Sequence, residues 1–528
     1  MCKYYLRVEA VNLANSIYDT SDISTIRGGS FMLLDAVNAI EEPGKIEKKS
    51  IGASSGLFAL PQASSKEEAE AVCQAVRKTL GEKGKNATFV VDFIESADSN
   101  TQAVIKELMA KNRWSQFQQA TIIPPPEKIK LLSEMKDAEP EAYKGEHVLK
   151  PCEKDGLYPG NVHAFKPGPG DERMWISERT YHRREFGKKL REGELFRKIA
   201  LPALSHFNNI PDFYKKFSRM NDNSVQFTRD LENLCQDPEK GALNGKIAFL
   251  YLDGNQFGDI RNTKCKIFDT LNNFDETVQF KLRGKALLEI LLAAMDDQDF
   301  KTENGQIRLE TLLWGGDEIE WVVPAWKGLE VAQTFFAQSA TFEGQDLTHC
   351  MGIVFCHHNA PIREIRKLAH HLADYVKADL KKNSDPPTKE NGNLIQYVVL
   401  ESFDAIQQDL DVFANQYYNL NCLNPLRINA DKELNTLVTQ LKTITRSFPH
   451  NKIYEITKLL KINNDYDSKE VKEGLEGILK RAYTEISLEK ETLEAALQVI
   501  GVEENPSKWF LIADLWDYVK YQKEGGGR

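Results

Sequence analysis

The feature that most constrains the fold is an order of elements that the sequence predicts twice. In each copy, apolar periodicity indicates a strand, a helix, two strands, a second helix and a final strand. This order is the split βαβ, or ferredoxin-like, motif of α+β domains. The first copy begins with a strand over residues 4–11, and the second with a buried strand over residues 246–252. We therefore expect two ferredoxin-like domains related by duplication.

Corresponding positions in the two copies favour duplication over a chance similarity of two α+β domains. Among the matching positions are Glu9 with Asp253 at the end of the first strand, Arg27-Gly28 with Arg283-Gly284 at the start of the first helix, and Ser54-Ser55-Gly56 with Gly315-Gly316-Asp317 between the middle strands. The spacing between matched positions grows along the chain, which indicates insertions in the second copy.

The whole sequence predicts four domains. They are a degenerate α+β domain at 1–123, a linker and partly helical insert at 124–240, a complete α+β domain at 241–404 and a helical domain at 405–528. Pro124-Pro125-Pro126 marks the first boundary, because consecutive prolines continue neither a helix nor a central strand. Amphipathic stretches such as residues 453–462 predict that the last domain is a small helical bundle.

The sequence contains no sign of membrane insertion or secretion. The longest apolar stretches, such as residues 286–295, are too short to cross a bilayer. The N-terminus lacks an apolar run followed by a small-residue cleavage site. The eight cysteines form no C-x-x-C pair, so we expect reduced thiols and no structural zinc. A cytoplasmic protein without membrane contact is predicted.

Charge and histidine placement give weaker signals. The net charge of −10 argues against a uniformly basic surface for nucleic acid but allows a local basic groove. Arg183-Arg184 and Lys188-Lys189 in the insert are candidates for such a surface, although the linear sequence shows no patch. We interpret His357-His358 and His370-His371 as structural or surface residues, because adjacent side chains on a strand or helix point in different directions.

Three carboxylates in the second copy are candidate metal ligands. Asp253 ends the first strand, and Asp317 and Glu318 lie in the turn between the middle strands. These strands are neighbours in the split βαβ sheet, so the carboxylates can meet at one edge. Magnesium prefers hard oxygen ligands, and phosphoryl transfer needs metal ions that hold the phosphates and activate the attacking hydroxyl.

Asp317 and Glu318 are consecutive, so they point to opposite faces of an extended hairpin. We expect only one of them to share metals closely with Asp253, and Asp317 is the first choice. The alternative is an ordinary hairpin turn with polar residues.

Glycines and one lysine complete the predicted nucleotide site. Gly315 and Gly316 are expected to accept turn dihedrals forbidden to other residues and to let a triphosphate approach the backbone. The turn from Gly254 to Gly258 follows a buried strand, where backbone N–H groups can face phosphate oxygens. Lys377 would contact a β- or γ-phosphate, with a solvated helix lysine as an equal alternative.

The first copy lacks the corresponding acids. Ser54-Ser55-Gly56 offers no carboxylate, and Glu9 alone is an insufficient ligand set for magnesium. We therefore interpret this copy as a structural or nucleotide-binding half. Arg27, Gly28 and Ser30 would either line a pocket that faces the active copy or cap the first helix, and the sequence leaves both open.

These motifs resemble a known family. Two palm-like domains, a degenerate one and one with Asp253-Gly254, Gly258 and the Gly315-Gly316-Asp317-Glu318 hairpin, are similar to the large signalling subunit of type III CRISPR–Cas effector complexes. The resemblance covers nearly the whole chain in domain order. It implies a cyclase that is activated by target RNA and converts ATP into cyclic oligoadenylate second messengers. It also implies assembly on a guide crRNA with the backbone and small subunits of the complex.

The resemblance also implies roles for single residues. Asp253, Asp317 and Glu318 would bind two Mg²⁺ or Mn²⁺ ions, Gly315 and Gly316 would make room for the triphosphate, Lys377 would contact phosphate, and Ser30 would meet base or ribose across the interface between the palms. Family members without a nuclease domain also join a second substrate such as S-adenosylmethionine to ATP, so that substrate is a candidate here.

The sequence departs from the family pattern in three ways. Glu318 replaces the usual aspartate, which leaves rate and product open. The N-terminal His-Asp nuclease domain is missing, so no DNA cleavage is expected. Only Cys152 remains near the four-cysteine zinc site that the insert usually carries.

Two other functions stay open from the sequence. A degenerate palm pair would serve only as a scaffold, although clustered acids without a cation are costly. A stand-alone dinucleotide cyclase of the Gly-Gly-Asp-Glu-Phe class would have Phe after the glutamate, whereas Ile319 follows here. That class also normally needs a second palm from a partner chain.

Overall fold

The computed structural model describes residues 4–118, 151–191 and 226–520, apart from positions 43, 53, 85–86, 98–99, 159, 161, 166–172, 382–385, 403–408, 464, 467 and 487–489, together with residues 199 and 203. The chain divides into two compact units. The first unit comprises Met1–Val225, Phe257–Lys281 and Thr311–Asp317, and the second comprises Gln226–Gln256, Leu282–Glu310 and Glu318–Arg528. The predicted boundary at Pro124-Pro125-Pro126 lies outside the described residues.

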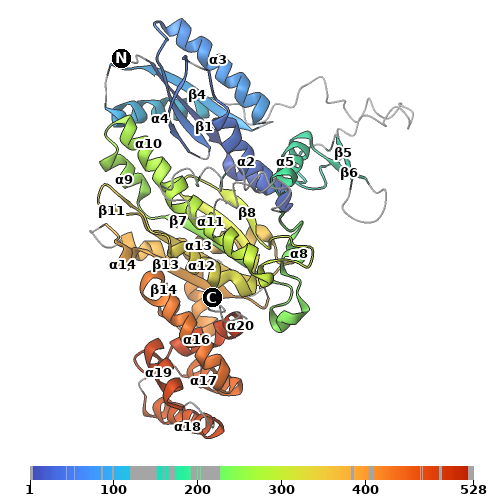
Figure 1. Ribbon diagram of the computed structural model, residues 1–528, viewed down its shortest axis with the longest axis vertical. Coiled ribbons are helices and arrows are strands. Elements are labelled where there is room, and N and C mark those ends of the chain that lie inside the picture. The colour runs from blue at the N-terminus through green and yellow to red at the C-terminus, as the bar shows by residue number, and fades with distance from the viewer. Residues whose placement is uncertain are drawn as a thin grey trace. The chain divides into compact units, whose positions relative to one another are not determined.

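The first unit contains a four-stranded antiparallel sheet, part of which is labelled in Figure 1. Its strand order is β2-β3-β1-β4. Its strands are β1 (Tyr4–Val11), β2 (Glu47–Ile51), β3 (Ser55–Leu60) and β4 (Thr88–Glu95). Its helices are α1 (Leu13–Ile17), α2 (Ile23–Asn38), α3 (Lys66–Lys83), α4 (Thr101–Phe117), α9 (Phe257–Lys264) and α10 (Phe268–Glu276). Apolar side chains of the sheet, α2 and α3 form one core. Strand order and connections are those of the ferredoxin-like fold.

The described part of the insert packs closely on α2. β5 (Val162–Phe165) and β6 (Arg173–Ile176) pair antiparallel, and α5 (Glu178–Lys189) follows them. A Cβ on Gly28 would lie 1.7 Å from the carbonyl oxygen of Arg183, and a Cβ on Gly187 would lie 1.9 Å from that of Ser24. Only glycine fits at both crossing positions, so these two residues set how closely α2 and α5 approach.

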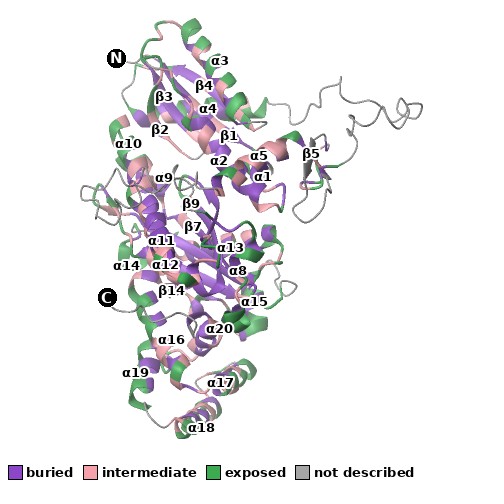
Figure 2. Ribbon diagram, turned by 45° about the vertical axis from the view of Figure 1, so that its right-hand side comes forward, coloured by how far each residue is buried: buried purple, intermediate pink, exposed green. Residues whose placement is uncertain are grey.

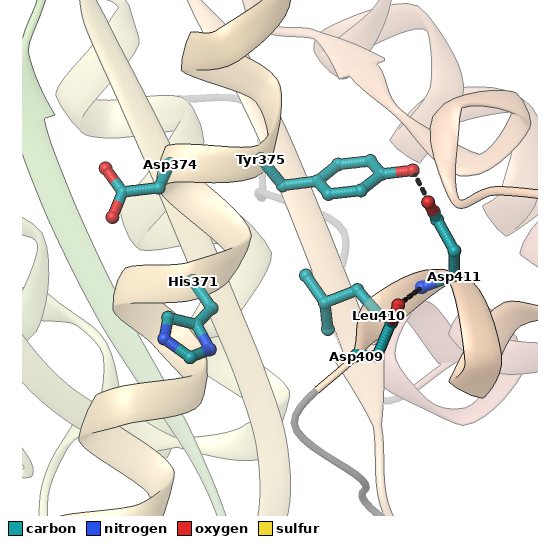
Figure 3. A pocket seen from close by; sticks show the side chains of 6 residues that line it. All are labelled: His371, Asp374, Tyr375, Asp409, Leu410 and Asp411. Atoms are coloured by element: carbon teal, nitrogen blue, oxygen red, sulfur yellow. Dashed lines mark hydrogen bonds between the residues drawn. The ribbon is translucent and has the colours of Figure 1, made fainter.

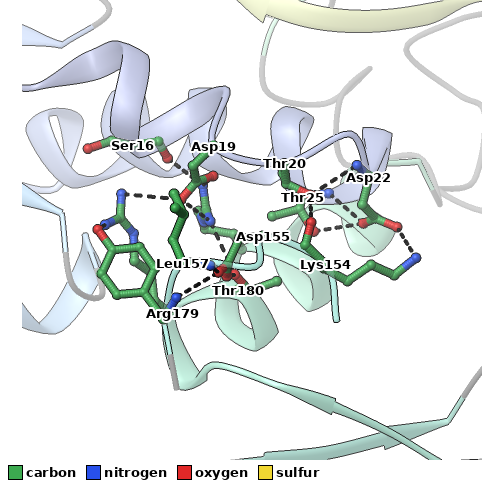
Figure 4. A network of polar contacts seen from close by, with 12 residues as sticks. Ser16, Asp19, Thr20, Asp22, Thr25, Lys154, Asp155, Leu157, Arg179 and Thr180 are labelled. Carbon is green, nitrogen blue, oxygen red and sulfur yellow. Dashed lines mark hydrogen bonds and ion pairs between the residues drawn. The ribbon is translucent and has the colours of Figure 1, made fainter. Parts of the chain in front are cut away.

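A buried polar network also joins the insert to the segment before α2 (Figure 4). Arg183 donates to both carboxylate oxygens of Asp19, at 2.8 and 3.0 Å, and to the carbonyl oxygen of Ser16 at 2.6 Å. Arg184 lies 3.6 Å from a carboxylate oxygen of Asp22. Both arginines are buried. They therefore stabilise the fold and do not form the exposed basic surface considered from the sequence.

The second unit is built on a larger sheet. β7 (Lys246–Gly254) pairs antiparallel with β9 (Glu318–Pro324) on one side and with β12 (His349–His357) on the other. β13 (Leu394–Val399) runs parallel to β12, and β14 (Ile428–Asn429) lies antiparallel to β13. β8 (Glu310–Trp314) precedes β9 in the chain. β7 is buried over most of its length (Figure 2), as expected for a central strand covered on both faces.

The helices of this unit are the short α8 (Leu231–Cys235) and α14 (Lys389–Gly392), the longer α11 (Lys285–Asp296), α12 (Gly328–Phe336) and α13 (Ile362–Lys381), and a C-terminal group of six. That group is α15 (Leu410–Tyr418), α16 (Asn435–Ser447), α17 (His450–Ile462), α18 (Lys469–Glu485), α19 (Lys490–Ile500) and α20 (Lys508–Lys520). α13 packs on β7, β12 and β13, while α20 packs on α16 and α17. No helix in the described ranges is both long and apolar enough to cross a membrane.

The predicted fold class, α+β with two ferredoxin-like domains, a mixed insert and a helical C-terminal region, is confirmed. The strand expected at 4–11 has the observed bounds of β1, and the strand expected at 246–252 lies within β7. The first helix, whose start was expected at Arg27-Gly28, begins earlier, at Ile23, because the Asp22 side chain accepts a hydrogen bond from Thr25 N. The domain limits at 123, 240 and 404 stay predictions.

Candidate metal and nucleotide site

The end of β7 places Asp253 beside a lysine from α13. Lys377 Nζ lies 2.5 Å from Oδ2 of Asp253 and donates to the carbonyl oxygen of Gly254 at 2.8 Å. The two side chains are only 15 and 14 % exposed, so the ion pair is shielded from bulk water. Lys377 is thus no solvated helix lysine, and that alternative is wrong.

Glu318 is the cross-strand partner of Asp253. The antiparallel register pairs Asp253 with Glu318. It also pairs Tyr251, two residues earlier on β7, with Glu320, two residues later on β9. Opposite residues project from the same face of a sheet, and so do residues two apart on one strand. All four side chains therefore share one face. Glu318, rather than the first choice Asp317, is the acid directly opposite Asp253.

Tyr251 links the strand to the Glu318 carboxylate. Its hydroxyl donates to Oε1 of Glu318 at 2.7 Å. Burial, followed by the negative charges of Glu318 and Asp253, raises the pKa of Tyr251. The phenol therefore stays protonated and remains a hydrogen-bond donor over the whole physiological pH range.

α13 covers this face with three polar side chains in helical register. Arg366, His370 and Lys377 are four and seven residues apart, which places them on one side of the helix. Arg366 Nε donates to Oε1 of Glu320 at 2.6 Å, and His370 Nε2 lies 3.0 Å from the same oxygen. Glu320 is fully buried, so these partners offset the cost of its desolvated charge.

The backbone after the predicted glycine turn is held by a buried arginine. Arg283 Nη2 donates to the carbonyl oxygen of Glu318 at 2.6 Å, and Arg283 is fully buried. Neither Gly315 nor Gly316 has a positive φ, so the expected left-handed turn dihedrals are not present. A Cβ on Gly316 would meet open space, and Asp317 is exposed. Room for a triphosphate at these glycines stays a prediction.

The turn after β7 is fixed by an asparagine. Asn255 is buried, and its Nδ2 donates to the carbonyl oxygen of Gly392 at 2.7 Å and to Thr348 Oγ1 at 3.0 Å. Its backbone N–H donates to the carbonyl oxygen of Thr348, so this N–H is not available to a phosphate. Gly258 lies in the first turn of α9, where a Cβ would meet open space. Phosphate contact by Gly254 and Gly258 stays a prediction.

The first copy has the same strand pairing but lacks the second carboxylate. Glu9 pairs with Ser55 across β1 and β3, as Asp253 pairs with Glu318. Ser55 thus corresponds to Glu318, two residues away from the match proposed on sequence. Arg7 Nη1 lies 2.5 Å from Oε2 of Glu9. The Glu9 carboxylate is therefore neutralised by its own strand.

The Arg27-Gly28-Gly29-Ser30 segment lies inside α2 and not at its start, so its suggested role as a helix cap is wrong. Arg27 and Ser30 are buried, and Arg27 Nη1 donates to the carbonyl oxygen of Gly187 at 2.7 Å. This hydrogen bond of Arg27 holds α5 against α2. Nucleotide contact by Arg27 and Ser30 stays a prediction.

Asp253 and Glu318 fit a metal ion that is shared with substrate phosphates. Both offer hard oxygen donors from one face of the sheet, and Mg²⁺ in nucleotide enzymes commonly uses one or two carboxylates with phosphates and waters. Within the described ranges, no group of three or more His, Cys, Asp or Glu side chains is arranged to hold a metal. The pair therefore does not form a complete protein cage.

A separate open cavity of about 550 Å³ lies on another side of α13 (Figure 3). Its lining residues are His371, Asp374, Tyr375, Asp409, Leu410 and Asp411. Tyr375 Oη donates to Oδ1 of Asp411 at 2.6 Å. Neither Asp253 nor Glu318 lines this cavity, so it is not the predicted site.

Tyr251, Asn255 and Glu320 are not predicted from the sequence as site residues. Strand alternation carries a signal for Tyr251, because residues 251 and 253 on one strand share a face. The contacts of Asn255 come from segments about 90 and 140 residues away, and no sequence spacing indicates them.

Comparisons with known proteins identify the fold. No protein-family model and no curated protein matches the chain. The crystal structure of a Csm1–Csm4 cassette in complex with pppApApA is similar, with a TM-score of 0.50 and 11 % identity over 98 % of this chain and 70 % of that one. The crystal structure of Csm1 in T.onnurineus gives a TM-score of 0.50 and 10 % identity over 99 % and 70 %. Identity this low shows the fold alone.

Proposed function

We propose that this chain, which has the fold of the type III CRISPR protein Csm1, is a metal-dependent nucleotidyl transferase. The observation that carries the proposal is the pairing of Asp253 with Glu318 across β7 and β9, with Lys377 Nζ 2.5 Å from Asp253. Two carboxylates and an ammonium group on one sheet face provide metal ligands and positive charge, which are the main protein contributions to phosphoryl transfer.

Each residue has a distinct proposed role. Asp253 and Glu318 would hold Mg²⁺ or Mn²⁺. A bound metal supplies Lewis-acid activation of the phosphates and of the attacking hydroxyl. Lys377 Nζ carries three donors, so it would contact a phosphate oxygen while it remains near Asp253.

We propose ATP as the substrate and an ATP-derived second messenger as the product. The solved Csm1–Csm4 cassette is in complex with pppApApA, and this chain shares the Csm1 fold. The product would be a cyclic oligoadenylate or an ATP conjugate, for example with S-adenosylmethionine. Proposed partners are the backbone and small subunits of a type III effector complex, the guide crRNA and the target RNA.

Mass spectrometry of reaction products tests the proposal directly. The assembled complex is incubated with ATP and Mg²⁺, with and without matching target RNA and S-adenosylmethionine. We expect a linked nucleotide product that depends on target RNA, and Asp253→Asn should lower its yield by about 100-fold or more. Glu364→Gln is the matched control, because Glu364 is exposed on α13 and pairs only with Lys367 among the contacts observed at that position.

The other candidate functions give different results. A scaffold would assemble normally yet bind neither ATP nor Mg²⁺ in calorimetry. A stand-alone cyclase would form a dinucleotide product from the isolated chain without target RNA. An unchanged product yield in Asp253→Asn would contradict the proposed site.

A further inference from the structure

The Glu318 side chain is held by a hydroxyl from the neighbouring strand. Tyr251 lies diagonal to Glu318 across the β7–β9 ladder, and its hydroxyl donates to Oε1 at 2.7 Å. Arg283 holds the main-chain carbonyl of the same residue at 2.6 Å. Glu318 is therefore fixed at its backbone and at one carboxylate oxygen, which leaves Oε2 for another partner.

The Tyr251 ring is itself held in place by His370, which contacts the buried Glu320. Its ring stacks on His370, with ring centroids 3.4 Å apart and planes 20° apart. His370 Nε2 lies 3.0 Å from Oε1 of Glu320, which also accepts from Arg366 Nε at 2.6 Å. A hydroxyl on a ring held in this way has little freedom to follow a carboxylate that moves. The length of the side chain at position 318 must therefore match the position of the hydroxyl.

From this geometry we propose that Tyr251 is a positioning residue that orients the Glu318 carboxylate toward a divalent cation, and that the site is built for glutamate at position 318. This inference rests on the proposed metal-dependent function. An aspartate at position 318 is one methylene shorter, so its carboxylate would lose the contact with Tyr251 Oη. Related hairpins carry aspartate at this position. Here the longer side chain of Glu318 reaches a hydrogen-bond donor on β7, the hydroxyl of Tyr251.

A double-mutant cycle with Mn²⁺ as the probe tests this inference. Mn²⁺ affinity of the full chain is measured by calorimetry, and the bound ion by electron paramagnetic resonance, with ATP present. Tyr251→Phe keeps the ring stack but removes the hydroxyl, and we expect about tenfold weaker Mn²⁺ binding. Glu318→Asp should weaken binding to a similar degree. The double variant should be less than about twofold weaker than Glu318→Asp alone, because the contact is already lost.

Tyr397→Phe is the matched control. Tyr397 is a fully buried tyrosine of β13 in the same sheet, and it makes no contact with Asp253 or Glu318 in the structure. We expect unchanged Mn²⁺ affinity for this variant. Equal thermal midpoints for Tyr251→Phe and wild type would exclude a general loss of folding.

The outcomes separate this inference from the proposed function. Wild-type Mn²⁺ affinity in Tyr251→Phe, or fully additive effects in the double variant, would overturn the positioning role and leave the metal site standing. Absence of Mn²⁺ binding by the wild-type chain with ATP would overturn the proposed function and this inference together.

Discussion

The ammonium group of Lys377 pairs with Asp253 in the structure, and we propose that it also contacts a substrate phosphate. In the structure its ammonium group neutralises Asp253 and binds the carbonyl oxygen of Gly254. A phosphate that enters the site would compete with Asp253 for the same ammonium group, because lysine acts as a movable point charge. Removal of this charge should therefore affect both nucleotide affinity and catalysis.

We expect Lys377→Met to lower product formation by about 10- to 100-fold and to weaken ATP binding. Methionine retains most of the packing volume but leaves Asp253 without this cation. Product yield and ATP affinity are measured on the assembled complex. Lys367→Met is the control, since Lys367 is 63 % exposed on the same helix, and it should stay within about twofold of wild type. Normal ATP affinity in Lys377→Met would contradict the proposed contact between Lys377 and a phosphate.

The site could be predicted from sequence only up to the level of its motifs. Asp253, Glu318 and Lys377 follow from strand ends, a turn and a helix, and all three take part in the observed cluster. The choice between Asp317 and Glu318 could not be predicted, because a shift of one residue moves every side chain of a strand to the other face. The register of β7 and β9 decides that choice, and it depends on pairing between segments 65 residues apart.

Strands were easier to predict than helices for a physical reason. Buried strands such as β1 and β12 are short apolar runs whose ends coincide with polar residues. α4 was not predicted, because most of its length is exposed and its buried side includes polar residues such as Gln102 and Asn112. The first helix of the second copy is a π-helix over Thr277–Gly284 followed by α11, a change of winding that apolar spacing does not reveal.

The crossing of α2 and α5 explains two glycines that otherwise weaken their helices. Glycine in a helix interior costs roughly 1 kcal/mol relative to alanine. At Gly28 the gain is a backbone approach that any Cβ would prevent. The segment that was expected either to line a pocket or to cap the first helix therefore packs α2 against α5.

Gly28→Ala should destabilise the protein by about 2–3 kcal/mol, because the new methyl group would overlap the carbonyl of Arg183. Thermal unfolding measures this change as a midpoint several degrees lower. Gly81→Ala in α3 provides the control, since a Cβ there meets no atom within 4 Å. That variant should be neutral or more stable by up to about 1 kcal/mol. Equal stability of the two variants would contradict the close crossing.

The stability of the second unit as a whole is coupled to pH through its last helix. Tyr418 Oη donates to Oδ2 of Asp514 in α20 at 2.9 Å. Burial raises the pKa of Asp514 to about 7, although the hydrogen bond from Tyr418 acts in the opposite direction. Phe355 of β12 contacts Tyr518 of α20, with ring centroids 4.3 Å apart. Ionisation of Asp514 therefore acts on the contact between the C-terminal helices and the sheet.

The raised pKa determines the direction of the pH dependence. The folded state binds the proton more tightly than the unfolded state, so this stabilising contribution is complete below about pH 4 and is lost as the pH rises through 7. Asp514→Asn should remove this loss of stability at high pH, because asparagine does not ionise. We expect the variant to be more stable than wild type at pH 8, by on the order of 1–2 kcal/mol, and to show a flatter slope from pH 5 to 8.

Thermal unfolding across this pH range provides the measurement, and Asp517→Asn in the same helix provides the control. The unfolding midpoint of the control should depend on pH as that of the wild type does. A wild-type slope in Asp514→Asn would show that the Asp514 carboxyl is ionised in the folded protein throughout the range.

The arginine that neutralises Glu9 makes the inequality of the two halves hard to reverse. Arg7 occupies the position on β1 that Tyr251 occupies on β7, and Ser55 stands where Glu318 stands. Supplying the missing acid by Ser55→Glu would leave Arg7 to neutralise it, while replacing Arg7 alone would leave a single carboxylate. No single substitution in the first copy therefore creates a pair of opposed carboxylates free of Arg7, so a second metal-binding pair would require at least two changes.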